Sequence, residues 1–278
     1  VNIYWIGIKR EKTKGKRIRR QAFVKETIMK KFTVLVLLAI IVSMCSTAMA
    51  LDPMGAPSAG LTQGQKSSGI EYSYSKQKLW RSVDEETTSM EQEINKVYAR
   101  FGYGISDKTE GFVRVGVADY EYERAGYYAP WKGDDDTALA IGVGIKTTFA
   151  EADGIRWGGL AQVSRANYKG SRKNSDSSSS WQTGSFETEV VEFLLTAGPT
   201  FNPTEDVSVY CGPFIHLIDG DHFHSHGGGS RKYEVEERSS VGAYVGAQIE
   251  LAENRAVTVE YQRTNDAWGF AGGIVIRH

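Results

Sequence analysis

The sequence has 278 residues, of which 41% are hydrophobic and 24% charged, with 33 Lys+Arg against 34 Asp+Glu. Residues 1–50 hold 11 of the basic residues and 2 of the acidic ones, so the remainder carries 22 basic and 32 acidic residues, a net charge of −10. A surface that negative argues against nucleic-acid binding.

Residues 29–50 have the three parts of a secretory signal peptide. These are the basic start Met29-Lys30-Lys31, an apolar run over 32–42, and the small-x-small site Ala48-Met49-Ala50. The apolar run is too short for a membrane-spanning helix, which needs about 20 residues. We therefore predict export with cleavage after Ala50. We interpret residues 1–28 as a mis-annotated upstream segment; a translated basic extension is the alternative.

Residues 51–68 are rich in Gly, Pro, Ser and Gln without periodicity, which predicts a flexible periplasmic lead-in. From Gly69 onward, apolar residues recur at every second position, which is typical of β-strands with two different faces. The alternation predicts about ten strands, over 69–79, 92–105, 110–122, 137–149, 155–169, 186–201, 206–218, 233–251, 255–264 and 267–277.

The predicted connections alternate in length. Turns at 106–109, 151–154, 202–206 and 252–255 are short and rich in Asp, Asn, Gly and Pro, whereas long polar connections are expected at 80–91, 123–136, 170–185 and 219–232. One further connection on the long side, 264–266, is short. Such sorting is expected when one end of an antiparallel barrel faces the periplasm and the other faces outward.

The second face of the strands is dominated by Gly and Ala with single charges. In the strand over 137–149, for example, Leu139, Ile141 and Val143 alternate with Ala140 and Gly142. Glycine weakens a solvent-exposed strand but suits the crowded inner side of a narrow barrel. We therefore expect the apolar face to contact lipid. The fold class predicted for 69–278 is all-β, a closed antiparallel up-and-down transmembrane β-barrel of about ten strands, with eight or twelve as alternatives.

This architecture resembles the small outer-membrane β-barrel proteins of Gram-negative-type bacteria, the class that includes opacity-protein-like and OmpA/OmpX-like barrels. The resemblance rests on the export signal, the alternating strands and the sorted loops. It implies an outer-membrane location, contact with membrane lipid and lipopolysaccharide, and a monomer. One departure is the end of the chain, Ile276-Arg277-His278, where such barrels usually have an aromatic residue.

The alternation also places eight ionisable residues on the inner face, four of each sign: Glu71, Arg100, Arg114, Lys146, Arg156, Glu192, Glu250 and Glu260. Unpaired charge is costly in a narrow interior, so we expect these residues to form a lumen charge network. Barrels near eight strands are filled by side chains, which favours a largely plugged lumen. We expect a structural or surface-interaction role with a possible ligand at the external loops; a small-conductance channel for polar solutes is the alternative.

The chemically densest segment is 219–226, with His222, His224 and His226 as weak metal-ligand candidates in a predicted loop. Their spacing matches no zinc pattern, so no metal, cofactor or catalytic residue is assigned. A second alternative is an outer-leaflet hydrolase like the omptins, in which Asp221-His222 and the run over 134–136 would supply acid–base pairs. Their expected position in loops argues against that hypothesis.

Overall fold

The computed structural model describes residues 51–278 except 84–85, 125–130, 136, 175–181, 227–228 and 237–239. The predicted signal peptide at 29–50 and the upstream segment 1–28 lie outside the described residues. The described part is all-β, and it contains no helix long and apolar enough to cross a membrane.

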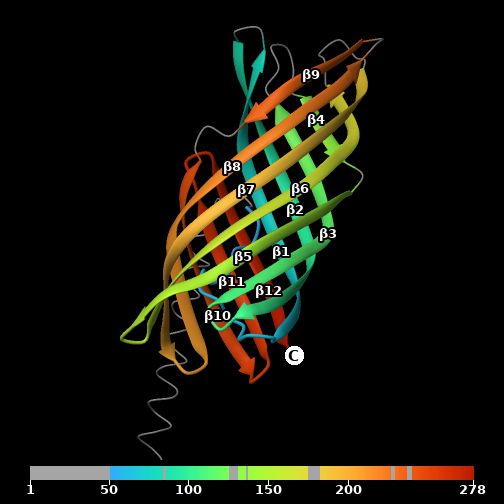
Figure 1. Ribbon diagram of the computed structural model, residues 1–278. Helices are drawn as coiled ribbons and strands as arrows, with labels where there is room; N and C mark the ends of the chain where they lie inside the picture. The colour runs from blue at the N-terminus through green and yellow to red at the C-terminus, as the bar shows by residue number, and fades with distance from the viewer. Residues whose placement is uncertain are drawn as a thin grey trace, which may run out of the picture. The chain divides into compact units, whose positions relative to one another are not determined.

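Twelve antiparallel segments form one closed sheet (Figure 1). They are β1 (Lys66–Val83), β2 (Glu86–Ser106), β3 (Thr109–Arg124), β4 (Trp131–Asp135), β5 (Ala138–Ala152), β6 (Ile155–Asn174), β7 (Gln182–Thr204), β8 (Val207–His226), β9 (Gly229–Glu236), β10 (Val241–Ala252), β11 (Arg255–Arg263) and β12 (Ala267–Arg277). The sheet closes where β1 pairs with β12, from Ser67 opposite Arg277 to Gln77 opposite Ala267.

The twelve segments occupy ten positions around the barrel. The short β4 lies in line with β5, because both pair with β3 on one side and β6 on the other. Similarly β9 and β10 follow one another along β8. The closed, ten-position barrel agrees with the predicted fold class. The strand predicted over 233–251 is wrong in one respect, because β9 ends at Glu236 and β10 begins at Val241.

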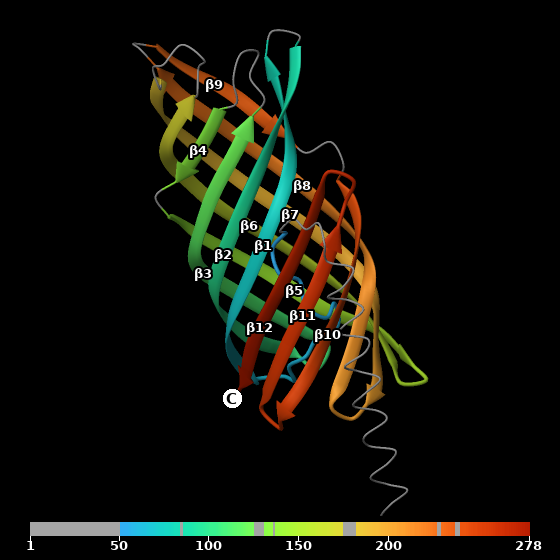
Figure 2. The same ribbon diagram turned by 180° about the vertical axis from the view of Figure 1, so that it is seen from behind.

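Fewer strands surround the barrel at the end that carries β4 and β9 than at the end that carries β10, β11 and β12 (Figures 1 and 2). At the β4 and β9 end, β9 pairs directly with β1, with Trp80 and Arg81 opposite Glu236 and Val235. This pairing bypasses β10, β11 and β12, so the ring at that end closes through eight positions.

A belt of exposed apolar side chains surrounds the part of the barrel next to the tight turns. The belt includes Ile70, Val97, Phe101, Val113, Val115, Val117, Leu139, Ile141, Val143, Ile145, Phe149, Trp157, Val163, Phe193, Leu195, Ile215, Leu217 and Ile274. From Leu139 to Phe149 is ten residue steps, roughly 34 Å along the strand, or roughly 25 Å along the axis at a tilt of about 40°. This height matches the hydrocarbon thickness that such barrels span.

Beyond this belt the strands continue with charged residues on the outside. On β3 the outward residues change from Val117 to Asp119, Glu121 and Glu123, while Tyr120 and Tyr122 point inward. The prediction of long external loops is therefore largely wrong, since most of 80–91, 170–185 and 219–232 belongs to strands that extend the barrel wall. Their outer face is polar because it meets water, and this polarity hides the strand pattern.

Candidate functional site in the barrel lumen

The interior of the barrel holds the chain's own segment 51–61, which we call the lumen segment (blue in Figure 2). Leu51 and Met54 are 1% exposed, and Asp52 is 3% exposed. The expectation of a flexible periplasmic lead-in over 51–68 is wrong for this part. Its Pro, Gly and Ala give no strand period, but they let a compact chain fit inside the barrel, and β1 already begins at Lys66.

Hydrogen bonds from several strands hold the lumen segment. Glu260 of β11 accepts from the backbone N–H groups of Met54, at 3.0 Å, and Gly55, at 2.8 Å. Thr148 of β5 and Glu110 of β3 accept from Ala59 and Gly60, at 3.1 and 2.7 Å. Further contacts join Ser58 to Thr200, Gln262 to the carbonyl of Asp52, and Arg114 to the carbonyl of Pro53.

Two glycines leave room for the lumen segment. A Cβ at Gly158 would lie about 2.5 Å from backbone atoms of Ser58, and one at Gly104 would overlap the carbonyl of Thr62, the residue that follows the lumen segment. Other inner glycines accommodate aromatic rings, since a Cβ at Gly144 would enter the ring of Phe112 and one at Gly246 the ring of Tyr210. The glycines of the inner face therefore provide the space into which the lumen segment and the aromatic rings fit.

One buried charge cluster lies at the inner end of the lumen segment. Lys96 Nζ lies 2.8 Å from Asp52 Oδ1 and 2.6 Å from Glu192 Oε1, and all three side chains are at most 9% exposed. Glu192 Oε2 lies 3.5 Å from His216 Nε2, and Tyr98 donates to Asp52. The cluster thus links β2, β7 and β8 to the lumen segment.

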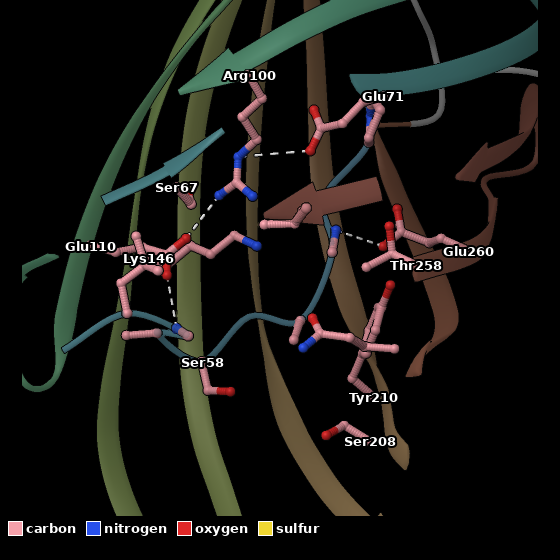
Figure 3. A pocket seen from close by; sticks show the side chains of 18 of the residues that line it. Ser58, Ser67, Glu71, Arg100, Glu110, Lys146, Ser208, Tyr210, Thr258 and Glu260 are labelled. Carbon is pink, nitrogen blue, oxygen red and sulfur yellow. Dashed lines mark hydrogen bonds and ion pairs between the residues drawn. The ribbon is translucent and has the colours of Figure 1, made fainter. Parts of the chain in front are cut away.

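A second cluster lies closer to the tight turns (Figure 3). Glu71 Oε2 is 2.7 Å from Arg114 Nε, and Glu71 Oε1 is 3.7 Å from Arg100 Nε. Arg100 Nη2 also donates to Glu110 Oε1 at 2.8 Å. The guanidinium groups of Arg100 and Arg114 lie over the ring of Phe112, at 4.4 and 4.7 Å from its centroid.

The structure brings the eight predicted network residues into the lumen but distributes them among several contacts. Glu250 pairs with Arg277 through two bonds of 2.8 Å, and Arg156 donates to the carbonyl of Ala59 at 3.4 Å. Lys146 lines a cavity without an ion-pair partner among the described residues.

Four ion-pair partners in these clusters were not predicted: Asp52, Lys96, Glu110 and Arg277. Lys96 and Tyr98 both lie in the inward phase of β2, so the period of two could have identified Lys96. Asp52 carries no periodic signal at all.

Aromatic residues fill the lumen beyond the apolar belt. Tyr120 stacks on Tyr168 with centroids 4.6 Å apart, and Tyr122 packs edge-on against Phe186 at 5.1 Å. His222 joins this group, 2% exposed, with Nδ1 at 2.7 Å from Thr188 Oγ1.

This burial corrects the view of 219–226 as a flexible loop, since the segment belongs to β8. His222 is enclosed by rings, and no cluster of metal-ligating residues is found within the described part of the chain. The side chains of His224 and His226, and those over 134–136, lie outside the described residues. Asp221 points outward to Lys232 at 2.8 Å, so Asp221 and His222 are on opposite sides of the wall and cannot form an acid–base pair.

Ion pairs also occur on the outer wall beyond the belt. Arg165 lies 2.6 Å from Glu189, and Lys169 lies 2.9 Å from Glu187. Hydrogen bonds from Lys169 and Asn167 lower the pKa of Glu187, and the hydrogen bond to Asp221 raises the pKa of Lys232. These charges mark the surface that faces water.

Comparison with solved structures finds similar barrels. The outer membrane protease OmpT from Escherichia coli is 10% identical, with a TM-score of 0.52 over 77% of this chain and 94% of that one. The translocator domain of the autotransporter NalP from Neisseria meningitidis is 12% identical, with a TM-score of 0.47 over 79% and 89%. OprG from Pseudomonas aeruginosa is 11% identical, with a TM-score of 0.40 over 79% and 98%.

No family model matches the sequence, and no curated protein matches it. At these identities the likeness concerns the fold alone. The closed barrel and its lipid-height apolar belt give this chain the fold of the small outer-membrane β-barrels, and the likeness to OmpT supports that fold.

Proposed function

We propose that this protein is a non-enzymatic outer-membrane barrel with a structural or surface-interaction role, and that its lumen is closed to solutes by residues 51–61 together with the aromatic side chains beyond the apolar belt. The observation that carries the proposal is the attachment of this segment to five strands. Polar contacts join it to Lys96 on β2, Glu110 on β3, Thr148 on β5, Thr200 on β7 and Glu260 on β11.

Export through cleavage after Ala50 fits this arrangement, because the mature chain would then begin at Leu51, inside the barrel. The apolar belt provides the surface that contacts lipid and lipopolysaccharide. The paired charges beyond the belt face the external medium. A ligand at the external end would bind to a rigid, aromatic-filled extension.

The conductance of the barrel tests the proposal. The wild type in planar bilayers should show no stable large channel, whereas deletion of residues 51–61 combined with Tyr120→Ala and Tyr168→Ala should produce a stable conductance, because both fillings of the lumen are then reduced. In the same Tyr120→Ala and Tyr168→Ala background, Gly158→Leu should replace the deletion without shortening the chain, since its side chain would occupy the place of Ser58. The matched control is Gly159→Leu. Gly159 is the next residue along β6 and faces outward, and a Cβ there would lie an ordinary 3.4 Å from the carbonyl oxygen of Thr196.

A stable, large conductance of the wild type would contradict the closed lumen and support the channel alternative. The hydrolase alternative has less support, because Asp221 and His222 are separated by the barrel wall. Cleavage of a peptide by the purified barrel, lost on replacement of either residue, would overturn the non-enzymatic assignment.

A further inference from the structure

A small cavity remains between the lumen segment and the barrel wall (Figure 3). Its volume is about 60 Å³, enough for a few water molecules or one small ion with water. The charged groups that line it are three carboxylates and four cations: Glu71, Glu110, Glu260, Arg100, Lys146, Arg156 and Arg277.

Each carboxylate of the cavity already has its own donors. Glu110 accepts from Arg100 and from the N–H of Gly60. Glu71 is paired with Arg114 and Arg100. Glu260 accepts from two N–H groups of the lumen segment and from Gln262. Arg277, which also lines the cavity, is paired with Glu250.

Lys146 is the exception. Its side chain is 5% exposed, yet its ammonium group makes no hydrogen bond or ion pair with any described residue. It lies 5.9 Å from the Phe112 ring centroid and comes close to Gly55. In Figure 3 the amino group of Lys146 and the guanidinium of Arg100 face the same space.

Arg156, on the same wall, is incompletely paired. Its one hydrogen bond to a described residue is the 3.4 Å contact with Ala59, and its Nε is buried without a partner. Glu71, Glu110 and Glu260 attract the Lys146 charge from beyond ion-pair distance. With Arg277 paired to Glu250, the four cations Arg100, Arg114, Lys146 and Arg156 outnumber these three carboxylates. The excess buried positive charge is costly because it is only partly offset. Water alone can supply acceptor atoms but no compensating charge.

We propose that this cavity binds one small inorganic anion of about the size of chloride, held by the ammonium of Lys146 beside the guanidinium of Arg100. The anion would complete the local charge balance and join the lumen segment to the wall. The cavity volume excludes large organic anions such as gluconate. The site does not depend on whether the barrel conducts, since it stands on the pairing of buried groups.

Bromide gives a direct test, because it resembles chloride and is visible by anomalous scattering. Crystals of the wild-type barrel grown in sodium bromide should show an anomalous peak in the cavity next to Lys146 Nζ. Crystals of Lys146→Met should lack it. Absence of the peak in well-diffracting wild-type crystals would overturn the proposal, leaving water as the occupant.

A solution measurement provides an independent readout. At constant ionic strength, the unfolding equilibrium of the wild type should favour the folded barrel in chloride over gluconate, by about elevenfold at a chloride concentration of ten times Kd. Lys146→Met should lose this dependence, whereas the exposed-turn control Lys108→Met should keep it. Equal anion dependence in Lys146→Met and the wild type would contradict the site.

Discussion

Lys96 is a buried cation that pairs with two carboxylates in the lumen. It is 2% exposed and is the only ammonium in contact with the two buried carboxylates of Asp52 and Glu192 among the described residues. Its long side chain lies on the inner face of β2, where Tyr98 follows in the same phase. Removing this one charge leaves two like charges close together in the interior.

We therefore predict that Lys96→Met destabilises the barrel by about 3–5 kcal/mol, because both carboxylates lose the ammonium group that they share. The measurement is equilibrium unfolding by urea in detergent micelles. The matched control is Lys76→Met, which removes exposed ion pairs with Glu91 and Glu93 and should cost at most about 1 kcal/mol. Equal losses in the two variants would show that the buried cluster contributes no more than the exposed one.

At the residue scale, periodicity was sufficient to orient side chains but not to pair them. The period of two placed Arg100, Arg114 and Glu71 on the inner face, where they now meet. It could not predict which charges meet, because partners such as Lys96 and Glu192 are 96 positions apart. That choice depends on the stagger of the strands and on the segment that enters the lumen.

The external extensions of the strands form an element with its own core. Tyr120, Tyr122, Tyr168 and Phe186 pack within the eight-position end of the barrel. The order Tyr-Glu-Tyr-Glu over 120–123 contains the strand period, with rings inward and carboxylates outward. The polarity of their outer face predicts loops, whereas the alternation of rings and carboxylates indicates strands.

We predict that Tyr168→Ala loosens this external end while the membrane part stays folded. The ring of Tyr168 is fully buried, so its loss should cost about 3–5 kcal/mol locally. Limited trypsin digestion should then cleave at the neighbouring Arg165 or Lys169 in the variant, and not in the wild type.

The control for that experiment is Tyr103→Ala, which truncates a ring that is 51% exposed on the outer face. This variant should remain as resistant to trypsin as the wild type. Resistance of Tyr168→Ala as well would mean that the aromatic group does not stabilise the external strands.

Closure between β1 and β12 is the feature that defines the whole molecule. Ile70 on β1 lies opposite Ile274 on β12, and both side chains face outward. Directly opposite residues of neighbouring strands have the separation that a disulfide bond requires. A double cysteine at these positions can therefore test the closure and its register.

We predict that Ile70→Cys with Ile274→Cys, in a Cys211→Ser background, forms an intramolecular disulfide in the folded barrel. The oxidised protein should keep a compact gel mobility after heating until it is reduced. The mis-registered pair Ile70→Cys with Ile276→Cys should form the bond poorly, since Ile276 lies opposite Ser68. Equal yields from both pairs would contradict the register.

For the molecule as a whole, the sequence by itself determined the class: alternating strands, tight turns at one end and an apolar belt facing lipid. These are local properties, because successive residues of a strand face lipid and lumen in turn and differ in type accordingly. Only the tertiary structure decided that residues 51–61 enter the lumen, that β9 closes onto β1, and which buried charges meet. Those outcomes depend on contacts between distant positions, such as Met54 with Glu260, for which single strands carry no local signal.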